Sequence, residues 1–350
     1  MNYNARNGAH TTMKKILAIL LACAMLLSLS ACGGSDEADL AQGQLEEITF
    51  VLDWTPNTNH TGLYVAIEKG YFTEAGLNVE VVQPPEGGAE VLVGSGKAQF
   101  GVSFQDYIAP GLIGDDPLPI TAVAAIIQHN TSGIVSRAGE GMDSPKGLEG
   151  HKYATWDLPV EKATIEQVMK AEGGDFSKVE LIPSTVTDEV SALQSGSVDA
   201  IWIFYAWAGI ACEVAELDTD YFAFADIDPV FDFYSPVVIA NNEYLAENPE
   251  SAKAFIAALS RGYEFAIENP KEAADILMEA APELKSNSDL VYASQEYLAD
   301  QYTADADRWG EFDEARWSAF FSWLNENNLL EGTVEPTAGF TNDYLPGGNS

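Results

Sequence analysis

Short apolar runs alternate with amphipathic stretches along most of the chain, from about residue 48 to residue 330. A short apolar run suits a strand buried in a sheet, whereas apolar residues spaced by three and four suit a helix that packs on it. The alternation predicts α/β architecture with largely parallel sheets, and a stretch of this length usually forms two domains. The expected strands are 48–52, 79–82, 100–103, 120–127, 133–135, 152–155, 179–182, 200–203, 222–224 and 236–240.

Two prolines mark helix starts in the later part of the chain. Asn248 precedes Pro249 and Asn269 precedes Pro270, so each pair places a capping residue before a proline at the first helical position. Residues 241–330 are therefore expected to form a helical tail. Four apolar residues in this tail repeat with helical spacing and are interpreted as core packing rather than as a ligand site: Trp317, Phe320, Phe321 and Leu324.

The beginning of the chain has the pattern of an export signal. Lys14 and Lys15 precede an apolar run over 16–29, which is shorter than the roughly 20 residues that a membrane span needs. The run ends in Leu-Ser-Ala before Cys32, a pattern that resembles the bacterial lipobox, in which the cysteine carries the lipid. The alternative is an ordinary cleaved signal in which Cys32 has no special role.

The lipobox resemblance implies a protein that is held on the outer side of the cell membrane by its lipid. Residues 1–31 are then a signal peptide with an upstream extension over 1–12. The following segment, 32–47, is small and acidic with little to bury, so we expect a lipid-anchored linker.

The net charge, the cysteines and the histidines limit the classes of function that the chain can have. The chain has 17 basic and 54 acidic residues, and removal of 1–31 leaves a net charge of about −40. Such a surface repels nucleic acid, which excludes that class of partner. Cys212 is the one cysteine beyond Cys32, in an apolar stretch that predicts a core position, so no intrachain disulfide is expected. The four histidines lack metal-ligand spacing, and we expect no metal: His10, His60, His129 and His151.

Motifs of catalysis are missing from the sequence. The glycine-rich run 94–97 suggests a nucleotide loop, but Val91 occupies the position of its first glycine and Ala98 that of its Ser/Thr. No Gly-x-Ser-x-Gly elbow is present, and no serine or cysteine is marked as a nucleophile. We therefore expect no catalytic residue and no cofactor.

One long segment carries a family resemblance. Residues 51–66 read VLDWTPNTNHTGLYVA and are followed by KGYF at 69–72 and GLNV at 76–79. These residues resemble periplasmic binding proteins of the thiamine-pyrimidine-precursor family, as do the segments 96–103 and 173–179. The resemblance extends from about residue 48 to residue 330.

The resemblance implies a fold and a function. The fold is the two-lobed periplasmic binding protein-like fold (type II), with a ligand cleft between the lobes. Residues 47–130 plus 236–350 would form lobe one, and 131–235 lobe two. The implied function is that of a monomeric solute-binding lipoprotein, which binds an aminopyrimidine precursor of thiamine and delivers it to the membrane subunits of an ABC importer.

The motif and the strand ends supply the expected ligand contacts. Asp53 and Trp54 follow the first strand, at the edge where open α/β sheets bind ligands, and Asn59 is placed to cap the next helix. The alternative for Trp54 is packing beneath that helix. The expected ligand-binding set is Asp53, Trp54, Asn57, His60, Tyr64, Gln105, Trp156, Glu161, Trp202, Tyr205 and Trp207.

Three kinds of contact are expected within this set. Trp54 and Trp202 would sandwich the ligand ring, because aromatic faces stack favourably. A carboxylate, from Asp53 or Glu161, would pair with the amino group and ring nitrogen of the ligand. Gln105 would donate from its amide, although a solvated loop position is the alternative.

Other functions remain open at this point. Another flat ring, such as riboflavin, would suit the same aromatic residues. Relatives of similar fold carry nitrate or alkanesulfonates, but an anion favours arginine, and the motif has none. The family also includes fungal pyrimidine synthases, which use a histidine in the motif at the position of His60. Their cysteine-rich iron motif is absent from the sequence, and we expect a binding protein, not an enzyme.

Overall fold

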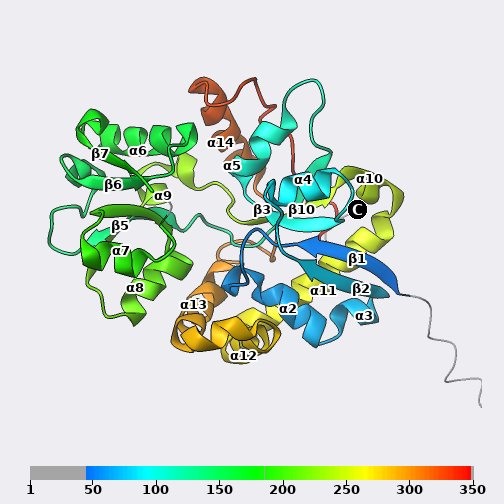
Figure 1. Cartoon of the computed structure of the whole chain (residues 1–350). Helices are drawn as coiled ribbons and strands as arrows, with labels where there is room; N and C mark the ends of the chain where they lie inside the picture. Colours follow the sequence, from blue (N-terminus) through cyan, green and yellow to red (C-terminus); the bar gives the residue numbers. More distant parts are fainter. Residues whose placement is uncertain (1–44, 185, 348–350) are drawn as a thin grey trace, which may run out of the picture. The chain divides into compact units, whose positions relative to one another are not determined.

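The structure is a computed structural model that describes residues 45–184 and 186–347 (Figure 1). The expected signal 1–31, the expected lipidation site Cys32 and the linker as far as residue 44 lie outside the described residues. Within the two described ranges, no helix combines the length and the apolar character needed to cross a membrane.

Within the described residues, ten strands form two five-stranded sheets. The first has the order β2-β1-β3-β10-β4, in which β1 is parallel to β2 and β3, and β10 is antiparallel to β3 and β4. Its strands are β1 (Glu46–Val51), β2 (Leu77–Val82), β3 (Phe100–Ser103), β4 (Ile120–Ala125) and β10 (Val237–Asn241). Its helices are η1 (Thr58–His60), α2 (Thr61–Glu68), α3 (Tyr71–Glu74), α4 (Gly88–Gly94), α5 (Gln105–Ile108), η2 (Ala109–Leu112), α10 (Asn242–Glu247), α11 (Pro249–Glu268), α12 (Pro270–Ala280), η7 (Pro282–Asn287), α13 (Ser288–Gln301) and α14 (Glu314–Glu326).

The second sheet has the order β7-β6-β8-β5-β9. β6 is parallel to β7 and β8, while β5 is antiparallel to β8 and β9. Its strands are β5 (Ser132–Arg137), β6 (Lys152–Thr155), β7 (Glu180–Pro183), β8 (Ala200–Phe204) and β9 (Thr219–Ala223). The helices between these strands are η3 (Pro145–Leu148), α6 (Pro159–Ala171), η4 (Phe176–Lys178), α7 (Glu189–Ser195), η5 (Tyr205–Gly209) and α8 (Ile210–Val214), and β9 is followed by α9 (Phe224–Ile227) and η6 (Pro229–Phe231).

The α/β prediction is confirmed, and all ten expected strands are present within a few residues of the expected bounds. The expectation of largely parallel sheets was too simple, because β10 and β5 each run against their neighbours. The chain leaves the first sheet after β4, builds the second, and returns as β10. The bounds of the two lobes, 47–130 plus 236–350 and 131–235, stay a proposal.

Alternate residues of β1 and β3 face two different cores. Phe50 and Phe100 point to α11, where the ring of Phe100 stacks 3.9 Å from the ring of Phe255. Val51 points to the opposite core, which includes α14. Burial of such side chains contributes about 1.5–3 kcal/mol each to folding.

Two further expectations about packing are confirmed. The four α14 residues Trp317, Phe320, Phe321 and Leu324 are fully buried in the core, and so is Cys212. Helices α11 and α12 begin at Pro249 and Pro270 as expected, but neither preceding asparagine side chain makes a capping hydrogen bond. The prolines alone therefore define these starts.

Helices α2 and α11 cross unusually closely. A Cβ atom on Gly262 would lie 2.0 Å from the carbonyl oxygen of Gly62, and a Cβ on Gly62 would lie 2.3 Å from the ring of Tyr263. Glycine at both positions permits this approach, which places the start of α2 firmly on the first sheet.

Two crossing segments connect the sheets, 126–131 and 228–236, and hydrogen bonds hold them together. The backbone N–H of Asn130 donates to Asp232 (2.9 Å), and its side-chain amide donates to the carbonyl of Phe231 (2.9 Å). The ring of His129 lies between two carboxylates, 2.7 Å from Asp232 and 2.8 Å from Asp305.

Candidate functional site

Asp53 and His60 form a fixed pair at the carboxyl end of β1. His60 is fully buried, and its Nδ1 accepts a hydrogen bond from the backbone N–H of Asn57 (3.2 Å). The proton of the neutral ring is therefore on Nε2, which lies 2.6 Å from Oδ1 of Asp53 and donates to it. The Asp53 side chain is 10% exposed. Among the described residues, no donor reaches its Oδ2, so this oxygen is available to a ligand.

Asn57 supports the turn that carries this pair. Its side-chain oxygen accepts from the backbone N–H of Asn59 (2.9 Å), and its amide donates to the carbonyl of Thr55 (3.1 Å). The expectation that Asn59 caps the helix was wrong, because the short helix η1 precedes α2 and shifts the cap to Asn57. Asn57 is nearly fully buried, so in this conformation its side chain holds the turn.

Trp54 and Tyr64 lie in different surroundings. Trp54 is 50% exposed, so it does not pack beneath the helix, and its ring is accessible to a ligand. Tyr64 is partly buried on α2 and packs on an apolar cluster of α12 and α13. Burial raises the pKa of its phenol, as does the Glu283 carboxylate nearby.

Gln105 has a structural role at the end of β3. It is fully buried, its amide donates to the carbonyl of Trp317 (2.8 Å), and its oxygen accepts from the backbone N–H of Tyr234 (3.0 Å). The expectation of a free amide donor therefore disagrees with the structure. Gln105 instead joins the end of β3 to α14 and to the second crossing segment.

The two residues that follow Gln105 at this strand end differ in exposure. Tyr107 is exposed, and its ring meets that of Phe104 edge-on at 5.2 Å. Burial raises the pKa of the Asp106 carboxyl to about 7, and the Glu90 carboxylate acts in the same direction. Gln105 was the residue expected from this strand end, whereas Asp106 and Tyr107 are not in the expected ligand-binding set.

Glu161 is a buried helix cap. Its two carboxylate oxygens accept four hydrogen bonds at the start of α6. The donors are Tyr153 Oη (2.7 Å), Thr155 Oγ1 (3.1 Å), the backbone N–H of Trp156 (3.0 Å) and the backbone N–H of Leu158 (3.2 Å). A carboxylate has about four acceptor positions, so none is left for a ligand. Of the two carboxylates expected to pair with a ligand, the structure leaves Asp53 available.

Two tryptophans belong to neighbouring strands of the second sheet: Trp156 directly follows β6, and Trp202 lies in the middle of β8. Trp156 is 41% exposed, whereas Trp202 is 8% exposed. The Trp202 ring lies 4.3 Å from the ring of Phe224 and 5.8 Å from that of Trp156, measured between centroids. Trp156 therefore offers an accessible face, and the Trp202 ring is already packed against two aromatic neighbours.

Tyr205 and Trp207, expected as ligand contacts, instead join η5 to helices of the first sheet. The Tyr205 hydroxyl donates to the Glu213 carboxylate, and its ring lies 5.5 Å from that of Tyr297 on α13. Trp207 packs on the apolar cluster of α12 and α13.

The ends of β3 and β8 meet through two aromatic rings. Phe104 and Phe204 lie 6.2 Å apart with an interplanar angle of 21°. Although the Tyr107 side chain is exposed, partial desolvation of its phenol raises the pKa of this group, and the carboxylates of Asp106, Glu90 and Glu161 add to the shift. Groups at the strand ends of the two sheets are thus within electrostatic reach of one another.

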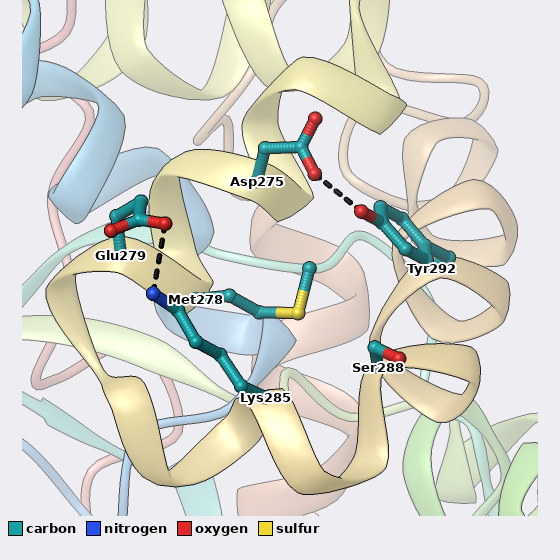
Figure 2. Close-up of a pocket in the computed structure, with 6 residues that line it drawn as sticks. All are labelled: Asp275, Met278, Glu279, Lys285, Ser288 and Tyr292. Atoms are coloured by element: carbon teal, nitrogen blue, oxygen red, sulfur yellow. Dashed lines mark hydrogen bonds and ion pairs between the residues drawn. The ribbon is translucent and has the colours of Figure 1, made fainter.

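A surface pocket of about 350 Å³ lies elsewhere, between α12, η7 and α13 (Figure 2). Its lining residues are Asp275, Met278, Glu279, Lys285, Ser288 and Tyr292. Figure 2 shows that Lys285 is paired with Glu279 and that the Tyr292 hydroxyl donates to Asp275. Because these polar groups are already paired and none belongs to the expected set, we place the candidate site at the strand ends.

Comparison with known proteins agrees with this architecture. A formylaminopyrimidine-binding protein of Halalkalibacterium halodurans is 31% identical over 329 residues, which cover 91% of this chain and 96% of that protein. The 4-amino-5-hydroxymethyl-2-methylpyrimidine phosphate synthase THI13 of Saccharomyces cerevisiae is 25% identical, over 71% of this chain and 74% of the synthase.

A solved structure supports the two-lobed type II fold. The periplasmic aliphatic sulphonate binding protein SsuA of Escherichia coli aligns with a TM-score of 0.64 and 15% identity, over 87% of this chain and 95% of that one. The family described as NMT1/THI5 like matches residues 57–273. The chain therefore belongs to the NMT1/THI5-like family.

Proposed function

We propose that the chain binds a thiamine pyrimidine precursor, an aminopyrimidine, and delivers it to an ABC importer. The observation that carries the proposal is the arrangement of Asp53: His60 fixes one of its oxygens, the other is available, and the exposed ring of Trp54 is the next residue. The relative from H. halodurans, whose name states that it binds a formylaminopyrimidine, aligns over nearly its whole length.

The chemistry of an aminopyrimidine suits this arrangement. Its ring is flat and can stack on an aromatic face, which contributes about 0.5–1.5 kcal/mol beyond burial. Its exocyclic amine donates hydrogen bonds, and a protonated ring nitrogen next to it donates another. A carboxylate accepts both, and hydrogen bonds to a charged group contribute about 1.5–3 kcal/mol each. Asp53 would therefore orient the ring, and Trp54 and Trp156 would contact its faces.

An anionic ligand fits the described residues less well. Each of the four arginines in the described part of the chain already lies beside a carboxylate: Arg137, Arg261, Arg308 and Arg316. Guanidinium groups are over-represented where carboxylates or phosphates are bound in a planar, bidentate way. The similarity to SsuA, at 15% identity, shows a shared fold and says nothing about the ligand.

The second part of the proposal is that the chain binds its ligand without catalysing a reaction. The resemblance to fungal pyrimidine synthases implies a reacting histidine at the position of His60. In this chain His60 is fully buried, and both ring nitrogens take part in hydrogen bonds within the protein. A histidine in this position is suited to orienting Asp53 rather than to reacting.

The cellular setting completes the proposal. Cys32 would carry a lipid after removal of 1–31, and the monomeric protein would work on the outer face of the cell membrane beside the importer subunits. A mature protein without a mass shift on Cys32, or a Cys32→Ala variant that still partitions into membranes, would contradict the anchor.

The direct test of the ligand class is native mass spectrometry of the protein purified under mild conditions. We expect a bound species with the mass of an aminopyrimidine, released by denaturation. A co-purified flavin or sulphonate would contradict the proposal.

A further inference from the structure

Two buried polar atoms of the second sheet have no hydrogen-bond partner among the described residues. They are the indole Nε1 of Trp202 and the hydroxyl of Ser132. Trp202 is 8% exposed and Ser132 is 1% exposed. Buried polar groups are nearly always paired, so two such atoms in one region call for a physical explanation.

The strand register brings these two side chains together. In the antiparallel pair of β5 and β8, Ser132 lies opposite Phe204, and Ile134 lies opposite Trp202. Residues opposite each other share a face of the sheet, and so do residues two positions apart. Ser132 and Trp202 are therefore diagonal neighbours on one face, with Cα atoms about 7–8 Å apart.

Their place coincides with the proposed ligand site. Phe204 ends β8 with its ring exposed, and the exposed ring of Trp156 lies against Trp202. The backbone here is well fixed, because the N–H of Ser132 donates to Asn130 Oδ1 (2.9 Å) and that of Tyr205 to the carbonyl of Thr131 (2.9 Å).

The chemistry of the two atoms defines what they bind. An indole N–H can only donate, and a hydroxyl can donate at the same time. Both are neutral, and the nearby Glu161 disfavours an anion, so the group that fits is a neutral acceptor such as a carbonyl oxygen. The faces of the Trp202 ring pack against Phe224 and Trp156, so its buried N–H is the group of this side chain that still lacks a partner.

We propose that Trp202 and Ser132 form a hydrogen-bonding subsite for a carbonyl oxygen of the ligand, such as that of a formylated amine. The inference rests on the proposed function and specifies it further. Asp53 would recognise the aminopyrimidine ring, and the subsite would distinguish precursors that carry a carbonyl substituent from those that lack one.

The test compares two probes by calorimetry: formylaminopyrimidine and the same compound without its formyl group. Trp202→Phe removes the donor and keeps a ring, and Ser132→Ala removes the hydroxyl. We expect each variant to lose about tenfold in affinity for the formylated probe and less than about twofold for the other. Trp309→Phe is the matched control, because its indole N–H already donates to the carbonyl of Ile126 (3.2 Å), and its probe preference should equal that of the wild type.

Each other outcome has a distinct meaning. Equal losses of affinity for both probes would overturn the subsite and show that Trp202 serves packing alone. Unchanged affinities would also overturn it, because water would then satisfy both atoms. A wild-type protein that binds neither probe would instead refute the proposed function. If a variant does not fold, the indole N–H resonance of Trp202 in the wild-type protein provides the test: it should shift with the formylated probe alone, and an equal response to both probes would overturn the subsite.

Discussion

Nε2 of His60 lies 2.6 Å from Oδ1 of Asp53 and must donate to it, because Nδ1 of the same ring accepts from the backbone N–H of Asn57. The tautomer of the buried histidine is thus set by the backbone. One carboxylate oxygen is held in place while the other is available, which is the geometry that a ligand-orienting carboxylate needs.

Replacement of Asp53 by asparagine should weaken binding of formylaminopyrimidine by about 10- to 100-fold, since a hydrogen bond to a charged group is worth about 1.5–3 kcal/mol. The asparagine oxygen can still accept from His60, so we expect the fold to persist. Calorimetry with the purified variant measures the change.

Glu161→Gln is the matched control for the carboxylate. Its four hydrogen bonds belong to the start of α6, so this variant should unfold at a lower temperature and lose less affinity than Asp53→Asn. The reverse order of affinity losses would transfer the orienting role to Glu161.

Trp54→Ala should reduce affinity by about tenfold through loss of the stacking face, with a change in folding stability within about 0.5 kcal/mol because the side chain is half exposed. Trp54→Phe should recover most of the affinity. Titration of both variants, with thermal unfolding alongside, measures the two effects, and an unchanged affinity in Trp54→Ala would exclude this ring from the site.

We expect the interactions of His129 to stabilise the two crossing segments more at low pH than at high pH. Hydrogen bonding to Asp232 raises the pKa of the His129 ring, with a further contribution from Asp305, although burial and the Arg316 guanidinium oppose this. Its contribution to stability is therefore complete below its ordinary pKa of about 6.5 and is lost as the pH rises through the raised value.

Urea unfolding of the wild type and of His129→Gln between pH 5.5 and pH 9 tests this expectation. The stability difference between the two proteins should be largest at the acidic end and should shrink as the pH rises. A difference that stays constant across the range would mean that the charge of His129 plays no part.

Gly262→Ala should destabilise the protein by about 1–3 kcal/mol, because its Cβ would meet the Gly62 carbonyl across the contact of α2 and α11. Gly87→Ala is the control, since a Cβ there lies 3.6 Å from the Val91 side chain, an ordinary contact. Equal unfolding free energies for the two variants would contradict the close crossing.

Local sequence pattern predicted the strands and the buried face of α14, because both depend on which side chains are apolar. It could not predict that β5 and β10 run antiparallel, since strand direction depends on where the chain crosses between the sheets. The cap at Asn57 was missed because a short helix precedes α2, and no apolar repeat marks so short an element.

The position of the candidate site stays a prediction, while the structure changes the roles of several of its expected residues. Sequence reasoning chose the strand ends, but the partners of Gln105 and Glu161 decide whether those side chains are free. Gln105 bonds to Trp317, which is distant in sequence, and Tyr205 packs on Tyr297. Contacts of this range depend on the assembled fold and leave no local signal, which is why the structural roles of Gln105, Tyr205 and Trp207 were missed. The hydrogen bonds of Glu161, in contrast, all come from residues close to it in sequence.

The central claim is that the site selects an aminopyrimidine, and the most direct test is calorimetric titration of the purified protein with formylaminopyrimidine, riboflavin and taurine. We expect saturable binding of the pyrimidine and no measurable heat from riboflavin or taurine at the same concentrations. Binding of taurine alone would contradict the heterocycle assignment, and preferential binding of riboflavin would contradict the pyrimidine assignment.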